Sequence, residues 1–414
     1  MAHAPPDPVH SSGSTTMGLR TKLLWVGVLY FASGLPFGIV NYLFPVFLRT
    51  EGAELSTIGR VISDVGLAWT LKFLWAPLVD RYGRRKTWII FCQFGIAALT
   101  LWLIAGDLVG GRVLLWGLLV GLAALSATQD IAVDAYTIEL LDVRELGVAN
   151  GIRVGAYRIA LIVASGGLVA LAGSFGWRVV FAVAAAIMGA VALLALGAPR
   201  RDRAPRHHPL LEPALALLRL PYLWAVVLFV LTFKLGDLAM QPMVAPFWVD
   251  RGLSESQIGL IGTLSIGCAI AGALLGGVLT TRWGVFRALW ILGLVQALSN
   301  LAYFLAAREG MTHSAIYAAA IVEQLTWGLG TSAFLAFLMS VCEKRYAATQ
   351  FAVLTALYGV SRWIAGRYSG DLTEALGYAG YFLLTFGMAL PAFALIAFIR
   401  RVPLRDQARA DLAA

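Results

Sequence analysis

Eleven ionisable side chains lie inside long apolar stretches of this chain, where a charge is expensive to bury. Arginine presents a planar fork of donors that suits a carboxylate or a phosphate. A carboxylate that moves between dry and wet surroundings binds and releases a proton. These residue types indicate anion binding and proton movement, with mutual structural pairing as the alternative. The six cations and five anions are Arg60, Lys72, Arg153, Arg158, Lys234, Arg362, Asp64, Asp130, Asp134, Asp237 and Glu323.

Two sets of these polar residues are predicted, one to bind an anion and one to take up and release protons. Arg158 and Arg362 come from different halves of the chain and are each expected near the middle of a membrane span. Two arginines placed in this way could bind a carboxylate or a phosphate in a shared cavity. The predicted substrate-binding residues are Arg158, Lys234, Arg362, Tyr157, Tyr358, Asn41 and Gln324. The predicted proton-coupling residues are Asp130, Asp237 and Glu323. A structural tie between Arg362 and Glu323 is the competing interpretation. Arg60 and Asp64 are four residues apart, hence on one helix face and able to pair.

The segment SATQDIAVDAY places Asp130 and Asp134 one turn apart on one helix face. Arg153 and Arg158 follow at similar depth in the next apolar stretch. The four groups form either a lock that holds one end of the molecule shut, or a proton site coupled to an anion site. The lock is preferred for Asp134, and the role of Asp130 stays open. Lys72 is expected to tie to a carboxylate of the Asp130 stretch.

Composition indicates that lipid is the solvent for most of this chain. Its 414 residues are 59% hydrophobic and 13% charged, with a mean hydropathy of +0.78, whereas soluble proteins carry about a quarter charged residues. The net charge of +9 would suit nucleic acid in a soluble protein, but the arginines lie in short loops between apolar stretches, so topology explains them and no nucleic-acid partner is expected. The cysteines and histidines show no metal-ligand spacing, and neither a metal nor a cofactor is expected.

Apolar stretches of about 20 residues can cross a bilayer core of about 30 Å, and twelve are expected here. They lie near 23–47, 57–79, 87–106, 112–136, 146–172, 177–198, 222–248, 256–280, 286–307, 313–341, 346–369 and 378–400. The expected fold is therefore an all-α membrane protein with two six-helix bundles. The predicted divisions are a flexible tail at 1–21, bundles at 22–198 and 222–401, a basic linker at 199–221 and a tail at 402–414.

Loop charge predicts the orientation of these spans. Twenty Lys and Arg lie on the side that holds both termini and the loop at 80–86, and six lie on the opposite side. Because positive loops face the cytoplasm, both termini and the linker are expected there.

The two halves of the chain resemble each other at an offset of about 200 residues. FPVFLRTEG at 44–52 matches APFWVDRG at 245–252, and DRYG at 80–83 matches TRWG at 281–284. Such a repeat of spans is how many secondary transporters are built, and no G-x-x-x-x-G-K-[ST] phosphate loop is present. The sequence thus predicts a transporter, not an enzyme, that acts as a monomer by alternating access.

The segment LKFLWAPLVDRYGRRK at 71–86 resembles the signature loop of the major facilitator superfamily. Its loop residues are Asp80, Arg81, Gly83, Arg84 and Arg85, and with Asp134, Arg153 and Lys72 they form the predicted gating set. The family usually has glycine four residues before the aspartate, where this chain has Ala76.

Together with ATQDIAVDAY, NGIRVGAYRIALIVASGG and YFASGLPFGI, this segment is similar to one branch of the superfamily, over about residues 22–175. That branch holds the AmpG-type muropeptide permeases of bacteria and the eukaryotic acetyl-CoA transporters. The resemblance implies proton-driven import of anionic anhydro-muropeptides across the bacterial inner membrane. Related siderophore permeases share the element at Thr128 to Asp134, so import of a ferric chelate is the alternative, followed by transport of an acetyl-CoA-like anion. AmpG-type permeases often have two further spans, for which this chain has no room.

Overall fold

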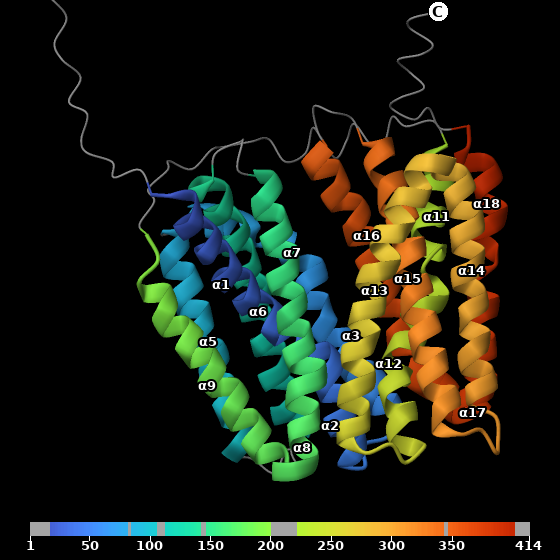
Figure 1. Ribbon diagram of the computed structural model, residues 1–414, viewed down its shortest axis with the longest axis horizontal. Helices are drawn as coiled ribbons and strands as arrows, with labels where there is room; N and C mark the ends of the chain where they lie inside the picture. Colours follow the sequence, from blue (N-terminus) through green and yellow to red (C-terminus); the bar gives the residue numbers. More distant parts are fainter. Residues whose placement is uncertain are drawn as a thin grey trace, which may run out of the picture.

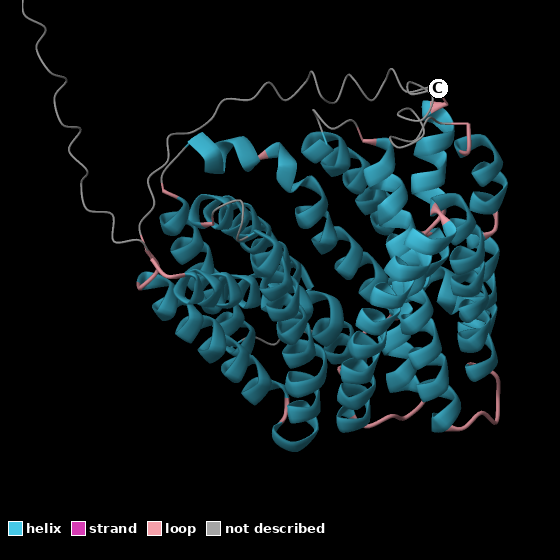
Figure 2. Ribbon diagram, turned by 45° about the horizontal axis from the view of Figure 1, so that its top comes forward, coloured by secondary structure: helices cyan, strands magenta, loops and turns pink. Residues whose placement is uncertain are grey.

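The computed structural model describes residues 17–81, 84–105, 112–141, 146–199, 222–342 and 347–401. Throughout these ranges the regular elements are helices, and no strand occurs (Figure 2). The predicted all-α class is therefore confirmed. Gly83 and nearly all of the predicted linker and tails lie outside the described residues, and for Asp80 and Arg81 only the backbone is described.

The helices form two bundles, which are shown side by side in Figure 1. The first bundle consists of α1 (Leu19–Gly38), the π-helix η1 (Ile39–Leu43), α2 (Phe44–Thr50), α3 (Leu55–Leu71), the 3₁₀-helix η2 (Lys72–Leu74), α4 (Ala76–Arg81), α5 (Arg85–Ala105), α6 (Arg112–Leu140), α7 (Leu146–Ile162), the π-helix η4 (Val163–Leu168), α8 (Val169–Phe175) and α9 (Trp177–Leu196). The second consists of α11 (Leu223–Thr232), α12 (Leu235–Asp250), α13 (Glu255–Trp283), α14 (Val285–Ala306), α15 (His313–Val341), α16 (Ala347–Arg367), α17 (Ser369–Ala389) and α18 (Pro391–Ile399).

Ten helical stretches of the described chain are long and apolar enough to cross a membrane. The predicted span at 57–79 is helical but divides into α3, η2 and α4 just before Pro77, since proline lacks the amide donor that continues a helix. The predicted span at 346–369 corresponds to α16, which carries two arginines and several hydroxyl side chains. Neither is among the ten, so the expected number of twelve spans is not confirmed.

The bundles touch at one end and diverge at the other (Figure 1). We call the end where α1 begins the terminal side, and the end where α2 and α12 finish the far side. Contacts between bundles join α3 to α16 and α17, α2 to α12, and α8 with η4 to α13. Glycines allow the close approach: a Cβ on Gly259 of α13 would collide with the backbone of Gly166 in η4. Small residues are how membrane helices pack tightly without a hydrophobic driving force.

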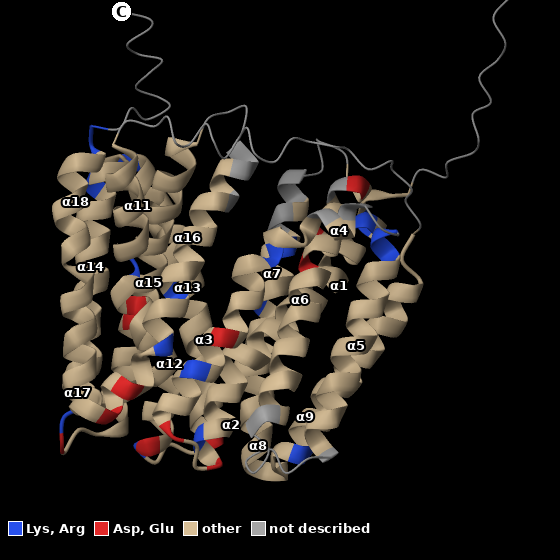
Figure 3. Cartoon of the chain, turned by 180° about the vertical axis from the view of Figure 1, so that it is seen from behind, with Lys and Arg blue, Asp and Glu red and all other residues tan. Residues whose placement is uncertain are grey.

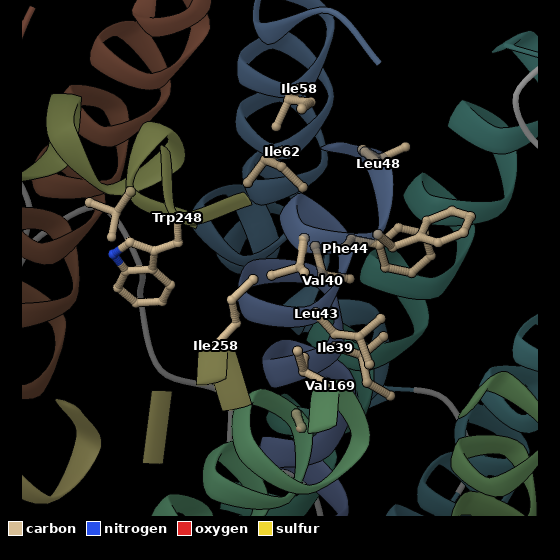
Figure 4. Packing of buried hydrophobic residues seen from close by; sticks show 14 of the residues in the cluster. Ile39, Val40, Leu43, Phe44, Leu48, Ile58, Ile62, Val169, Trp248 and Ile258 are labelled. Atoms are coloured by element: carbon tan, nitrogen blue, oxygen red, sulfur yellow. The ribbon is translucent and has the colours of Figure 1, made fainter. Parts of the chain in front are cut away.

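Apolar side chains from both bundles form a continuous core on the far side. Val40, Leu43 and Phe44 of the first bundle are fully buried in one cluster with Trp248 and Ile258 of the second (Figure 4). This cluster packs the two bundles against each other at that end.

Candidate functional site

A cavity of about 530 Å³ lies between the bundles, and both contribute to its wall. Asn41, Tyr157 and Arg158 line it from the first bundle, and Tyr358 and Arg362 line it from the second. Gln324, also predicted for binding, lines it as well, so six of the seven predicted binding residues share this cavity. The volume falls in the range of about 300–1,000 Å³ typical of small-molecule sites.

The π-helix η1 presents polar groups to the cavity from an otherwise apolar segment. Pro36 precedes it within α1 and Pro45 follows it at the start of α2. Proline removes an amide donor, and a π-turn with its extra residue rotates the side chains that follow. Asn41 and Tyr42 of η1 both reach the cavity, and Asn41 Nδ2 donates to the carbonyl of Phe37 at 2.9 Å.

Arg362 is held at the centre of the cavity by neutral partners. Its guanidinium donates to Asn41 Oδ1 and lies 5.6 Å from the centre of the Phe37 ring. That ring is fixed by an edge contact with Trp69 at 5.2 Å and by Tyr157 at 6.1 Å. Among the described residues no carboxylate pairs with Arg362, so the predicted competing tie to Glu323 is not formed.

Arg158 lies in the same cavity on α7, one residue after Tyr157. Within the described chain it makes no ion pair and no hydrogen bond. Two guanidiniums from opposite bundles therefore face one cavity, and neither is ion-paired within the described chain. Each offers a planar set of donors that matches a carboxylate or phosphate in a two-point contact.

The remaining charged groups of the cavity pair within the first bundle. Lys72 Nζ lies 3.5 Å from Asp130 Oδ2, as expected for Lys72. Asp134 accepts from Tyr30 Oη at 2.5 Å and lies 3.6 Å from Arg153, whose guanidinium also covers the Tyr30 ring. The predicted pair of Asp134 and Arg153 is thus present, but it joins α6 to α7 and does not bridge the bundles. It cannot hold the terminal side shut in this conformation.

This end of the cavity is open to solvent. The side chains of Arg153 and Asp134 line the cavity, yet they are 48% and 41% exposed. The signature-loop cations lie beyond it: Lys86 Nζ donates to the carbonyls of Leu196 and Ala198, and Arg85 lies 3.8 Å from Glu139. Arg84 is exposed.

Three predicted residues of the second bundle lie behind the cavity wall. Lys234 stands at the break between α11 and α12, donates to Gln296 Oε1 at 2.6 Å and lies 3.5 Å from Asp237. It is 1% exposed and does not line the cavity, so its predicted role in substrate binding has no support from this geometry. Glu323 is equally buried, and neither of its carboxylate oxygens has a hydrogen-bond partner among the described residues.

On the far side, ion pairs connect the two bundles, and sequence analysis missed them. Arg49 of α2 makes a two-point contact with Asp250 of α12, at 2.5 and 2.6 Å, and Tyr378 donates to the same carboxylate at 2.7 Å. Figure 3 shows positive and negative residues gathered together at this end. These contacts tie the bundles directly beneath the cavity.

Arg60 and Asp64, whose spacing would allow a pair, do not pair with each other, because each pairs across the bundle interface instead. Arg367 Nη1 lies 2.5 Å from both oxygens of Asp64, and Arg60 pairs with Asp371. Residues four apart on one helix can meet, but a partner on a facing helix competes with that contact. Arg367 was counted only as one of the six far-side loop cations, and so was not considered as a partner for Asp64.

A model of the Major Facilitator Superfamily matches residues 26–366. The chain belongs to that superfamily. The Anhydromuropeptide permease of Escherichia coli (strain K12) is 35% identical over 393 residues, which cover 90% of this chain and 79% of the relative. Putative transporter AmpG 4 of Rickettsia felis is 26% identical, over 92% of this chain and 97% of the relative. The family and branch that the sequence motifs resemble are therefore confirmed.

Solved structures of the superfamily share the fold at low identity. A bacterial homolog of the human lysosomal transporter Spinster, in an inward-facing and unoccupied conformation, has a TM-score of 0.76 at 16% identity and covers 94% of this chain and 98% of that one. The nucleoside transporter NupG has a TM-score of 0.73 at 16% identity, with coverage of 94% and 100%. The protein is a multi-pass transporter of the bacterial inner membrane.

Proposed function

We propose that the protein imports anhydromuropeptides, which are cell-wall sugars bearing peptide carboxylates, and that protons drive this import. The observation that carries the proposal is the cavity in which Arg158 and Arg362 face each other's bundle without a carboxylate partner among the described residues. The similarity to the Anhydromuropeptide permease supports the choice of substrate.

The chemistry of the cavity suits a solute with both charge and sugar rings. A substrate carboxylate would take the place of Asn41 at Arg362, exchanging a neutral acceptor for a charged one, which forms a stronger hydrogen bond. Phe37, Tyr157 and Tyr358 offer ring faces on which a sugar can lie. An uncharged solute would offer the two guanidiniums only neutral acceptors, which form weaker hydrogen bonds than a carboxylate does.

Orientation follows from the loop cations, which support a cytoplasmic terminal side. With that orientation, the solvent-exposed end of the cavity faces the cytoplasm and the ion-paired far side faces the periplasm. The structure then represents the state that releases an imported solute. One chain supplies both walls of the cavity, which supports action as a monomer.

Two buried sites are proposed to carry the proton. Asp130 lies at the open end, paired with Lys72 and with its Oδ1 unpartnered in the described chain. Glu323 lies deeper, with Asp237 and Lys234 as its charged neighbours in the same bundle. An ionised carboxylate without a donor is costly to bury, and a bound proton removes that cost.

The substrate is tested by binding to the purified protein. Isothermal titration of an anhydromuropeptide, a ferric siderophore and acetyl-CoA should give tight binding for the first compound alone. Tighter binding of the siderophore or of acetyl-CoA would overturn the proposed substrate.

A further inference from the structure

A second, smaller chamber adjoins the far-side end of the cavity. Its volume is about 50 Å³, and Asn41, Tyr42, Gln241 and Gln324 line both spaces. Like the cavity, it lies between the bundles, and residues of both bundles form its wall.

Four polar atoms of the chamber wall are buried without a hydrogen-bond partner in the described part of the chain. They are Ser165 Oγ, Trp248 Nε1, Ser265 Oγ and Tyr303 Oη. The four residues are 4%, 8%, 7% and 0% exposed. An unsatisfied buried donor or acceptor costs about 1–3 kcal/mol. Others occur elsewhere in the described helices, but these four surround a single space. Four around one chamber indicate a space that is built to receive a polar guest.

The backbone around the chamber is also irregular. Asn41 comes from η1 and Ser165 from η4, the two π-helices of the described chain. Single π-turns inside α-helices occur mostly at functional sites. Opposite Ser165, a Cβ on Gly262 would lie only 3.3 Å from its hydroxyl oxygen, so a larger residue there would crowd this wall.

The wall defines the chemistry of the guest. Every side chain that lines the chamber is uncharged, so the chamber has no counter-charge for an ion and suits a neutral polar group better. The indole of Trp248 can only donate, whereas the hydroxyls both donate and accept, so the guest must present an acceptor. A water needs about 10–15 Å³, so the chamber of about 50 Å³ has room for about three to five waters or for a small polar group. A sugar ring is too large, and an acetamido group, with four non-hydrogen atoms, fits.

We propose that this chamber binds the acetamido group of an N-acetylated sugar, with its carbonyl oxygen accepting from Trp248 and Tyr303. This assignment rests on the proposed function and deepens it. Asn41 lines the chamber and also bonds to Arg362, so the amide subsite and the anion site are one side chain apart. A substrate that fills both places its acetamido group toward the far side and its carboxylate at the arginines. We therefore expect the protein to recognise a solute that carries both a neutral amide and an anionic group, held on either side of Asn41.

The test compares two ligands, an anhydromuropeptide and an analogue in which neutral hydroxyls replace its acetamido groups. Trp248→Phe and Tyr303→Phe each remove one donor and keep the ring, and Trp177→Phe, on the first bundle outside the chamber, is the matched control. Wild type and control should bind the acetamido compound about tenfold more tightly than the analogue by isothermal titration. Both chamber variants should lose most of that preference while binding the analogue as wild type does.

Unchanged preference in Trp248→Phe and Tyr303→Phe would contradict the subsite and leave the chamber as a space for water only. Failure of wild type to bind either compound would instead contradict the proposed substrate, and the subsite with it. Arg362→Ala separates the two, because it should weaken both ligands by the same factor and leave their ratio intact.

Discussion

At the scale of single residues, Arg362 shows what sequence reasoning can and cannot provide. Its position within an apolar stretch, and that of Arg158 in the other half, predicted that both would face a shared cavity. The neutral partner Asn41 was not predictable, because it depends on the π-turn that rotates η1. Lys234 was assigned to the cavity wrongly: depth along a helix can be read from sequence, but the face that the helix presents to a neighbour cannot.

Replacing Arg362 should weaken substrate binding without unfolding the protein. Arg362→Ala should raise the Kd for anhydromuropeptide at least tenfold, about 1.5 kcal/mol, the lower value for a hydrogen bond to a charged group. Arg362→Lys keeps the charge and loses the two-point contact, so it should fall between Ala and wild type. Isothermal titration measures both. An unchanged Kd in Arg362→Ala would contradict the role of Arg362 in substrate binding.

The buried carboxylates should separate proton coupling from substrate movement. Asp130→Asn and Glu323→Gln each remove one carboxylate that could bind and release a proton. We expect at least one of these variants to lose accumulation driven by the proton gradient while it still exchanges substrate across the membrane. Both reactions are measured in proteoliposomes, with Asp134→Asn as a carboxylate control. Normal accumulation in both variants would exclude these two residues as proton carriers.

At the scale of elements, the positions of most helices were predictable from apolar length, whereas their interruptions were not. Pro36 and Pro45 on either side of η1 indicate a disturbed helix, but the positions of the π-turns at 39–43 and 163–168 and of the break at Lys234 could not be predicted from the sequence. The repeat did contain one unused signal. At an offset of 201, Arg49 is the equivalent of Asp250, and equivalent residues of a two-fold repeat meet only near its axis. Their opposite charges indicate a contact between α2 and α12.

Breaking that contact should favour opening of the far side. Arg49 and Asp250 are about a quarter exposed, so their pair contributes about 1 kcal/mol, or a fivefold change in the balance of conformations. Asp250→Asn should therefore raise the labelling rate of a cysteine placed at Ala245, which lines the far-side chamber. The exchanged pair Arg49→Asp with Asp250→Arg should restore the slow rate. Equal labelling in all three proteins would show that the pair does not hold the gate.

At the scale of the whole molecule, composition and the repeat were enough to predict a helical membrane protein with two related halves. They could not predict which conformation is stable, since that depends on small differences between contacts on opposite sides. Here the described ion pairs between bundles lie on the far side.

Orientation can be checked directly with topology reporters. Because twenty of the loop cations mark one side, reporters fused after Lys86 and within 199–221 should both be active in the cytoplasm. Fusions after Glu309, in the loop before α15, should be active in the periplasm. Periplasmic activity at the first two sites would reverse the orientation and make the structure outward-facing.

Uptake of labelled anhydromuropeptide into proteoliposomes, with the outside more acidic than the lumen, tests the account most directly. We expect the labelled anhydromuropeptide to accumulate in the lumen above its external concentration. A protonophore should abolish this accumulation, and liposomes that lack the protein should take up none. Uptake that only equilibrates, whatever the pH gradient, would contradict proton coupling. Uptake no greater than in empty liposomes would contradict the substrate itself.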